Sequence, residues 1–181
     1  SSLAFPDVPG LKDAAMTTDD LLDMTRAPAS VLIGRADFIE VEMANILATF
    51  GCKVVLATER PWILAREDHD TSQRVAQALR EQGVEIVTRA TLESVKKKKG
   101  GFTCQLAGPK ERTVEVDKVL VSSRKPNTAG IGLDKLGMKL KEDGSIQVND
   151  CLETSVGGIY AIGDCTGGWM LSHSSSSMAV T

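Results

Sequence analysis

The feature that most restricts the possible folds is an alternation of mostly apolar runs and helical patterns between residues 30 and 87. The first run meets Gly34, after which apolar residues recur at near-helical spacing as far as Gly51. A second helical pattern opens at Asp70 and stops at Gly83. The apolar runs cover residues 31–33, 54–57 and 84–87. Short connections and continuous apolar strands predict a parallel sheet with right-handed crossovers.

The pattern changes after Ala90, where the helical spacing stops. Short runs separated by turns that contain glycine predict an antiparallel meander inserted on the sheet. These runs cover residues 92–95, 102–106 and 113–116. Residues 119–121 resume the buried-strand pattern, and residues 146–148 and 159–162 predict two more short strands. The basic cluster Lys96–Lys99 runs into two glycines, which favours a solvated hairpin tip over an anion site.

The composition excludes several classes of protein. A formal net charge of -3 argues against a nucleic-acid partner, because phosphate binding rests on clustered positive charge. No apolar stretch is long enough for a membrane span, and no targeting pattern opens the chain, so we expect a cytoplasmic protein. The cysteines Cys52, Cys104, Cys151 and Cys165 are too far apart for a CxxC pair or a zinc site, and they predict small buried side chains in a reducing compartment.

A strand, a glycine turn, a helix and a second strand form the geometry of a dinucleotide site, in which pyrophosphate lies at the helix N-terminus. The turn Gly34–Glu40 departs from the GxGxxG fingerprint, since it has one glycine and an extra residue. Asp37 would oppose the pyrophosphate as a like charge, and Glu40 stands where a glycine lets helix and strand approach closely. Both changes should weaken binding. A nucleotide site and a structural sheet with a glycine turn both remain open.

The end of the second strand, Thr58-Glu59-Arg60, bears on the type of nucleotide. An acidic group at this place accepts the ribose hydroxyls of NAD, whereas an arginine can meet the 2′-phosphate of NADP. Glu59 therefore favours NAD and Arg60 favours NADP, and an exposed pair without a ligand is the alternative.

Motifs along most of the chain resemble one enzyme family. They are Val31-Leu32-Ile33-Gly34, Phe38-Ile39, Val41-Glu42-Met43-Ala44, Gly51-Cys52-Lys53-Val54, Arg124-Lys125-Pro126-Asn127-Thr128 and Gly158-Ile159-Tyr160-Ala161-Ile162-Gly163-Asp164. In this order they resemble the pyridine nucleotide-disulfide oxidoreductases. The segment Met170-Leu171-Ser172-His173 makes the resemblance greatest to the dihydrolipoamide dehydrogenases within that family.

The resemblance implies a flavoprotein in which NAD exchanges a hydride with FAD, and FAD exchanges electrons with a redox disulfide that oxidises dihydrolipoamide. It implies an α/β, Rossmann-like, three-layer dinucleotide-binding domain with a parallel sheet and an inserted meander. Residues 1–29 would be a linker and edge of an FAD domain, residues 30–148 an NAD-binding domain, and residues 149–181 a return segment of the FAD domain. The implied NAD contacts are Gly34, Arg35, Ala36, Asp37, Phe38, Ile39, Glu40, Thr58, Glu59, Ala90 and Ser123. The implied FAD contacts are Gly163, Asp164, Met170, Leu171, Ser172 and His173.

The chain also departs from the family pattern. The family's redox module with its Cys-x4-Cys pair has no counterpart in this sequence. The family's C-terminal interface module with its His-x4-Glu pair has none either, since Arg74 follows His69 by five residues and Met178 follows His173 by five, and neither is a Glu. The resemblance therefore implies the middle part of a homodimeric parent enzyme, with no catalytic residue and no metal ligand of its own. Such a chain is not expected to complete the disulfide chemistry alone.

Other interpretations keep the fold and change the function. The parent could use another acceptor, as a mercuric reductase or a soluble transhydrogenase does, or the altered turn could leave a structural domain that binds no nucleotide. Serines around His173 lack a GxSxG elbow, which disfavours hydrolysis. The acidic residues of 67–70 directly precede a helix, which favours capping over metal binding.

Overall fold

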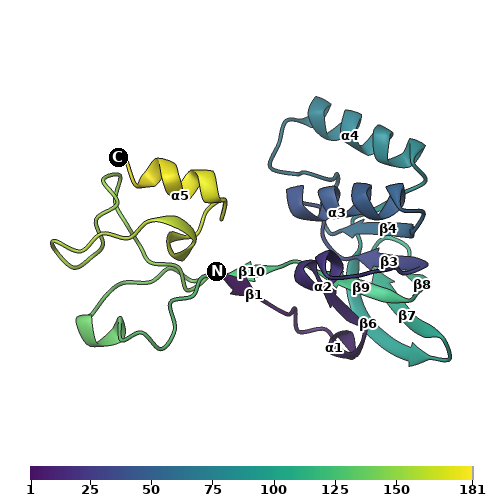
Figure 1. The fold of residues 1–181 in the computed structure, drawn as a ribbon, viewed down its shortest axis with the longest axis horizontal. Coiled ribbons are helices and arrows are strands. Elements are labelled where there is room, and N and C mark those ends of the chain that lie inside the picture. Colours follow the sequence, from purple (N-terminus) through teal and green to yellow (C-terminus); the bar gives the residue numbers. More distant parts are fainter. Residues whose placement is uncertain (181) are drawn as a thin grey trace. The chain divides into compact units, whose positions relative to one another are not determined.

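A computed structural model describes residues 1–180 of the chain (Figure 1). They form two compact units. The larger unit is Phe5–Ser122, and the smaller unit combines Ser1–Ala4 with the residues from Ser123 onward. The chain leaves the larger unit at Ser123, whose carbonyl accepts a hydrogen bond from the backbone N–H of Ala4 at 2.7 Å. The units therefore divide the chain after Ser122, whereas the family resemblance implies a domain end at residue 148.

Five parallel strands form the centre of the larger unit. Their order in the sheet is β2 (Ala15–Thr17), β9 (Lys118–Val121), β3 (Ser30–Ile33), β4 (Lys53–Thr58) and β5 (Glu85–Thr88). Helix α3 (Phe38–Thr49) connects β3 to β4, and helix α4 (His69–Glu81) connects β4 to β5. Parallel neighbouring strands need such crossovers, because the chain must return to the same end of the sheet before each new strand begins. The predicted parallel sheet is confirmed.

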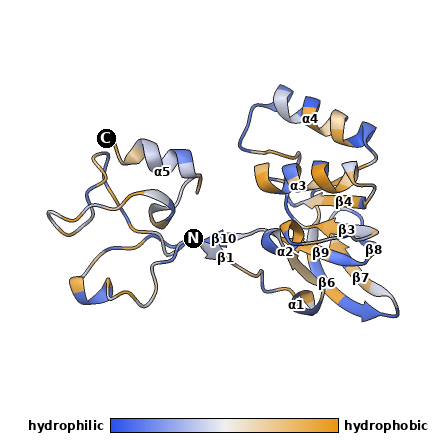
Figure 2. Ribbon diagram, in the orientation of Figure 1, coloured by the Kyte–Doolittle hydropathy of each residue, from blue (hydrophilic) through white to orange (hydrophobic). Residues whose placement is uncertain are grey.

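Side chains along β3 alternate between two hydrophobic cores. Val31 and Ile33 pack in the cluster that includes residues of α3 and α4, whereas Leu32 packs against the meander. The meander consists of the antiparallel strands β6 (Thr91–Lys98), β7 (Gly101–Ala107) and β8 (Arg112–Val116). The alternation follows from the two-residue period of a strand, and full burial of each side chain stabilises by roughly 1.5–3 kcal/mol. Helices, sheet and meander form the expected three layers, and hydrophobic residues are prominent in α3 and the strands (Figure 2).

Residues 1–29 are more than the predicted linker. They include helix α1 (Leu11–Ala14), the edge strand β2 and helix α2 (Thr18–Leu22). Met16 of β2 pairs with Leu120 of β9 and is 2% exposed. The predicted capped helix is confirmed, because the Thr17 hydroxyl accepts a hydrogen bond from the Asp20 N–H at 3.0 Å. The sequence did not indicate β2, because a three-residue strand has no measurable periodicity and forms by pairing with a strand far along the chain.

The smaller unit contains little regular secondary structure. Its elements are β1 (Ser2–Leu3), which pairs with β10 (Arg124–Lys125), the 3-10 helices η1 (Asp134–Leu136) and η2 (Gly163–Thr166), and helix α5 (Ser172–Met178). The strands predicted at 146–148 and 159–162 were wrong, since only isolated bridges occur there. Ile146 pairs with Leu140, but Val148 pairs with Thr154, so the partner changes before a ladder can form.

Candidate nucleotide-binding site

A cavity of about 440 Å³ lies at the carboxyl ends of β3 and β4. Because these strands are parallel, Gly34 after β3 and Thr58 at the end of β4 come to the same edge of the sheet. Open parallel sheets commonly bind ligands at this edge. The cavity is lined by Gly34, Arg35, Ala36, Asp37, Thr58, Glu59, Arg60, Ala65, Arg66, Ala90 and Thr91.

The turn after β3 forms one side of the cavity. Gly34 has open space where a Cβ atom would stand, so a ligand can approach the backbone there. The backbone N–H of Leu64 donates to the Ala36 carbonyl at 2.7 Å. This bond ties the loop between β4 and α4 to the turn and brings Ala65 and Arg66 to the cavity.

The N-terminus of α3 is filled by carboxylates of the chain itself. Asp37 is the N-cap residue, and its carboxylate forms an ion pair with the Arg35 guanidinium. Glu40 accepts a hydrogen bond from the backbone N–H of Asp37 at 3.0 Å. The same carboxylate accepts a hydrogen bond from the Ser122 hydroxyl, and Glu40 is only 3% exposed. The free N–H groups and the helix dipole stabilise these negative groups as they would stabilise a phosphate.

Glu40 does not line the cavity. Its carboxylate accepts a hydrogen bond from Ser122, which follows β9. The side chain that was expected to hold helix and strand apart therefore joins them instead. Asp37 does line the cavity, and its negative charge faces any ligand bound there.

The end of β4 forms the opposite side. Thr58 is buried, and its carbonyl accepts a hydrogen bond from the Ala90 N–H at 2.8 Å, while the Arg60 carbonyl accepts from the Arg89 N–H at 3.0 Å. The side chains of Glu59 and Arg60 form an exposed ion pair at 3.4 Å. The backbone of this side is therefore fixed by the chain entering β6, while the charged side chains remain free to respond to a ligand.

The structure gathers most of the predicted nucleotide contacts around the cavity. Those that line it are Gly34, Arg35, Ala36, Asp37, Thr58, Glu59 and Ala90. Phe38, Ile39 and Glu40 belong to α3 and lie outside the lining, and Ser123 belongs to the smaller unit. The predicted contacts omitted Ala65, Arg66 and Thr91, and the sequence named Arg60 only as a partner for the 2′-phosphate of NADP. The signal for Ala65 and Arg66 in the sequence is the nearby apolar residue Ile63, which is buried in the structure at 1% exposure. A large apolar side chain in this loop of mixed polarity indicates that the loop packs back onto the sheet.

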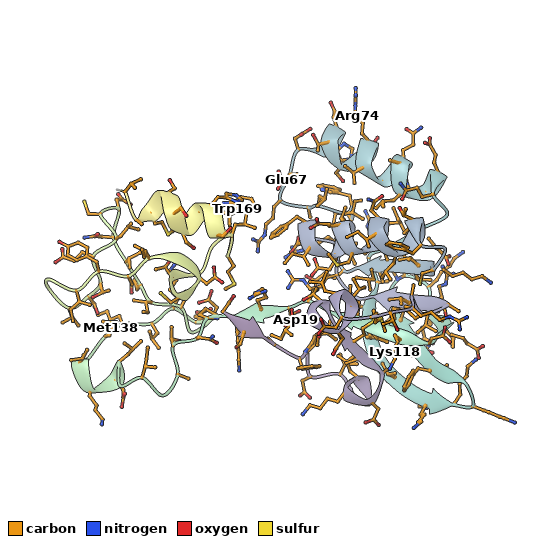
Figure 3. All side chains as sticks on the ribbon, viewed as in Figure 1. Asp19, Glu67, Arg74, Lys118, Met138 and Trp169 are labelled. Atoms are coloured by element: carbon orange, nitrogen blue, oxygen red, sulfur yellow. The ribbon has the colours of Figure 1, made fainter. Side chains whose placement is uncertain are left out.

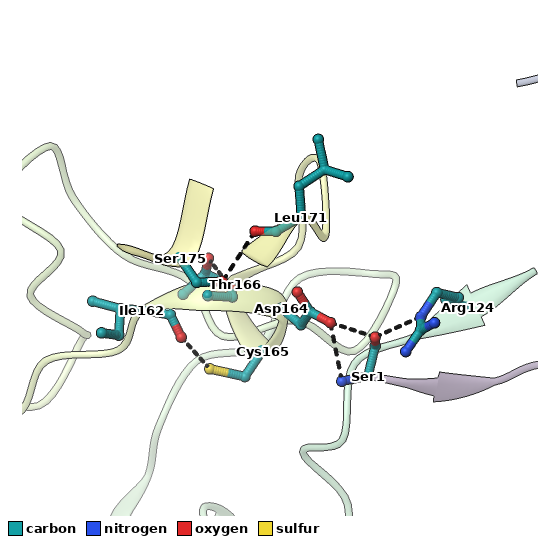
Figure 4. Close-up of polar contacts among 9 residues, drawn as sticks. Ser1, Arg124, Ile162, Asp164, Cys165, Thr166, Leu171 and Ser175 are labelled. Atoms are coloured by element: carbon teal, nitrogen blue, oxygen red, sulfur yellow. Dashed lines mark hydrogen bonds and ion pairs between the residues drawn. The ribbon is translucent and has the colours of Figure 1, made fainter. Parts of the chain in front are cut away.

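The predicted flavin contacts lie in the smaller unit. Gly163, Asp164, Met170 and Leu171 line a crevice of about 70 Å³, whereas Ser172 and His173 begin α5 and do not line it. The Asp164 carboxylate accepts a hydrogen bond from the hydroxyl of Ser1, and the Ser1 hydroxyl in turn accepts from the Arg124 Nε at 2.8 Å (Figure 4). The hydrogen bond from the Ser1 hydroxyl holds the pKa of Asp164 below its usual value. This carboxylate is thus an ionised acceptor whose partners come from its own unit.

Comparison with known proteins places this architecture in a family. The family description "Pyridine nucleotide-disulphide oxidoreductase" matches residues 1–179. The chain belongs to that family. The resemblance inferred from the motifs is therefore confirmed.

Named relatives of this chain are dihydrolipoyl dehydrogenases. The enzyme of Acholeplasma laidlawii is 35% identical over 187 residues, which cover 100% of this chain and 54% of the relative. The enzyme of Staphylococcus aureus is 33% identical over 175 residues, covering 94% of this chain and 37% of the relative. The chain thus spans about half or less of the length of these relatives.

Solved structures share the fold. The HOCl-induced flavoprotein disulfide reductase RclA from Escherichia coli superposes with a TM-score of 0.86 at 29% identity, covering 98% of this chain and 41% of RclA. LpdA from Mycobacterium tuberculosis gives a TM-score of 0.81 at 26% identity, covering 90% of this chain and 35% of LpdA.

Other candidate chemistry in this family member is limited. No cluster of His, Cys, Asp and Glu among residues 1–180 could hold a metal, and no helix in that range is both long and apolar enough to cross a membrane. Asp68 is the N-cap of α4 and accepts hydrogen bonds from the N–H groups of Asp70 and Thr71, so the predicted capping role is confirmed. All four cysteines are free thiols, and burial raises the pKa of Cys52 and Cys104 to about 11.

Proposed function

We propose that this chain is the part of a flavin-dependent disulfide oxidoreductase that binds the nicotinamide dinucleotide, which the sequence predicts as NAD(H). The observation that carries the proposal is the cavity at the carboxyl ends of β3 and β4, where Gly34, Thr58 and Glu59 meet. The named relatives support a parent enzyme of the dihydrolipoamide dehydrogenase type. The family resemblance suggests a homodimer, and the free thiols suit a cytoplasmic location.

The cavity suits the adenosine half of the cofactor. Its volume of about 440 Å³ falls in the range of small-molecule sites, roughly 300–1,000 Å³. Glu59, with a side chain that is 66% exposed, stands at the end of β4, where an acidic group can accept hydrogen bonds from ribose hydroxyls. Gly34 leaves its backbone open to a phosphate. The residues of this edge therefore fit the adenosine and its ribose, while Asp37 opposes the pyrophosphate.

When bound, the dinucleotide would exchange a hydride with the flavin of the parent enzyme. The residues of this chain would bind the dinucleotide and orient it. Thr58 and Ala90, joined by a backbone hydrogen bond of 2.8 Å, both line the cavity. Arg35, which forms an ion pair with Asp37, is the cation within the turn itself.

The residues of the smaller unit do not fit a flavin by themselves. The crevice around Gly163 and Asp164 has a volume of about 70 Å³, far below the roughly 300 Å³ at which small-molecule sites begin. We therefore assign no step to a flavin in this chain. We propose only that Gly163, Asp164, Met170 and Leu171 form one wall of a site shared with the rest of the parent enzyme.

A second candidate is a structural domain that binds no nucleotide. The ion pair of Arg35 with Asp37 and the Glu40 carboxylate favour it, because together they occupy the helix N-terminus where pyrophosphate would lie.

Calorimetric titration of the 181-residue chain with NADH and NADPH separates these candidates. The proposal predicts saturable binding of at least one dinucleotide, with a dissociation constant below about 1 mM. Gly34→Val projects a side chain into the open space of the turn and should weaken binding at least tenfold. Gly157→Val is the matched control, since Gly157 also has open space at its Cβ position but lies in the smaller unit. Absence of heat with both dinucleotides would establish the non-binding domain instead.

A further inference from the structure

A single peptide group joins helix α4 to the turn after β3. Its carbonyl belongs to Ile63 and accepts a hydrogen bond from the Ser72 hydroxyl at 2.7 Å. Its N–H belongs to Leu64 and donates to the Ala36 carbonyl at 2.7 Å. Because a peptide group is planar and its C=O and N–H point in opposite directions, this group is a rigid bridge between the helix and the turn.

The same arrangement is repeated inside the turn. The Ala36 carbonyl that accepts from Leu64 shares its peptide group with the N–H of Asp37. That N–H donates to the buried Glu40 carboxylate at 3.0 Å. A continuous series of hydrogen bonds therefore runs from Ser72 through two peptide groups to Glu40. Hydrogen bonds in such a series polarise and strengthen one another, so the loss of the first bond also weakens those that follow.

Burial and backbone conformation make this series depend on its first donor. Ser72 and Ile63 are each only 1% exposed, so little water can replace the hydroxyl as the donor to the Ile63 carbonyl. Leu64 has a φ of +49°, a left-handed conformation that a leucine keeps only where surrounding contacts hold it. Without the Ser72 hydroxyl, the loop would relax to bring the carbonyl to water, and Leu64 would lose its bond to Ala36.

The turn held in this way is the part of the proposed site that faces the ligand. Ala36 and Asp37 line the cavity, whereas Ser72 does not. Ser72 therefore touches no ligand and can affect binding only by fixing the position of the turn. Residues of a binding site need such support, because small displacements of the groups that meet the ligand weaken binding.

We propose that Ser72 is a positioning residue for the dinucleotide, which holds the turn through the peptide groups of Ile63–Leu64 and Ala36–Asp37. The inference rests on the proposed nucleotide-binding function and adds a residue from a helix outside the cavity. Arg74, two positions further along α4, has its side chain pointing away from the sheet (Figure 3). Positions two apart lie on nearly opposite faces of a helix, which agrees with the inward direction of Ser72.

The test measures dinucleotide binding and amide hydrogen exchange in the 181-residue chain. Ser72→Ala is expected to weaken the binding of NADH, or of NADPH if only that dinucleotide binds, by about tenfold. It should also speed exchange of the Leu64 amide by about tenfold more than exchange of the Leu56 amide in β4. Ser72→Thr keeps the hydroxyl and should restore both values to within about threefold of the unsubstituted chain.

Two control variants separate positioning from a general loss of stability. Ser30→Ala removes another serine hydroxyl that is bonded to the backbone, since it accepts from the Asp117 N–H at 3.0 Å at the start of β3. Arg74→Ala changes the outward face of α4. Both should leave dinucleotide binding and the exchange of Leu64 relative to Leu56 unchanged. Thermal melts identify loss of folding, and Ser72→Cys, with a weaker donor, replaces either Ser72 variant that does not fold and should weaken binding by about threefold.

The possible results separate the inference from the function on which it rests. Unchanged binding in Ser72→Ala, equal acceleration of exchange at Leu64 and Leu56, or equal weakening by Ser30→Ala would overturn the positioning role and leave the nucleotide site standing. Absence of binding of both dinucleotides to the unsubstituted chain would remove the proposed function, and the inference with it.

Discussion

The hydroxyl of Ser122 donates a hydrogen bond to the buried carboxylate of Glu40. Ser122 follows β9, and Glu40 lies in the first turn of α3, so the bond joins the sheet edge to the helix that borders the cavity. Glu40 also accepts the backbone N–H of Asp37 at 3.0 Å. One side chain thus fixes both the start of the helix and its distance from the sheet.

Removing this carboxylate should destabilise the larger unit. Glu40→Ala leaves the Ser122 hydroxyl and the Asp37 N–H without their partner and is expected to lower the free energy of unfolding by about 1–3 kcal/mol. Urea denaturation of the 181-residue chain measures the change. Glu42→Ala, on an exposed face of the same helix, should change it by less than about 0.5 kcal/mol. Equal effects of the two substitutions would show that the Glu40 bonds contribute nothing specific.

Asp37 should limit the affinity for a dinucleotide. Asp37→Asn removes a negative charge from the cavity and keeps a side chain that caps helices well, so dinucleotide binding is expected to tighten by about threefold to tenfold. Calorimetry gives the dissociation constants. Asp70→Asn, in the first turn of α4 and outside the cavity, serves as the control and should leave them unchanged. Weaker binding by Asp37→Asn would mean that Asp37 helps the ligand by orienting Arg35.

Gly10 should tolerate no side chain. Its φ is +75°, and a Cβ atom there would stand 2.0 Å from the Val95 carbonyl oxygen, so Gly10→Ala must move α1 away from the meander. We expect a loss of about 3 kcal/mol or more in the free energy of unfolding. Gly51 has a φ of +80° but open space around it, and Gly51→Ala should cost only about 1–2 kcal/mol of backbone strain. Similar losses for the two variants would contradict the close approach at Val95.

Two buried thiols should make stability fall at high pH. Burial raises the pKa of Cys52 and Cys104 to about 11 in the folded chain, whereas unfolded thiols ionise near pH 8.5–9. The unfolded state therefore releases these protons first, and the thiols' contribution to stability is full below about pH 8.5 and is lost as pH rises to about 11. Urea denaturation at several pH values measures this slope. The Cys52→Ala, Cys104→Ala double variant should show a shallower slope, and an unchanged slope would assign the effect to other groups.

The same burial should separate the cysteines by reactivity. At pH 8, iodoacetamide is expected to modify the exposed Cys151 and to leave Cys52 and Cys104 unmodified until urea unfolds the chain. Peptide mass spectrometry identifies the modified residues. Rapid labelling of Cys104 in the folded chain would show that β7 opens readily.

The alternation of strands and helices could be predicted because it depends on neighbours in the sequence. Gly34 and Gly51 mark the turn before α3 and its end, and Asp68 caps α4 through the N–H groups of the next residues. Apolar runs that are buried on both faces indicate a parallel sheet without knowledge of their partners.

The edge strand β2 and the isolated bridges could not be predicted in the same way. Met16 becomes a strand residue by pairing with Leu120, and Ile146 fails to become one because its neighbours pair elsewhere. Both outcomes depend on partners that are remote in the sequence, and short segments carry too little periodicity to reveal them.

By itself, the sequence determined the three-layer α/β architecture, the family and most of the residues around the cavity, because each depends on local periodicity or on a motif. Only the tertiary structure decided the direction of two charged side chains. Glu40 turns away from the cavity because the Ser122 hydroxyl offers its carboxylate a buried donor. Arg66 turns to the cavity because the Leu64 N–H ties its loop to Ala36. In each case, the partner that sets the direction of the side chain comes from a different strand or loop. The spacing of residues along the chain does not show which remote residue will be the partner.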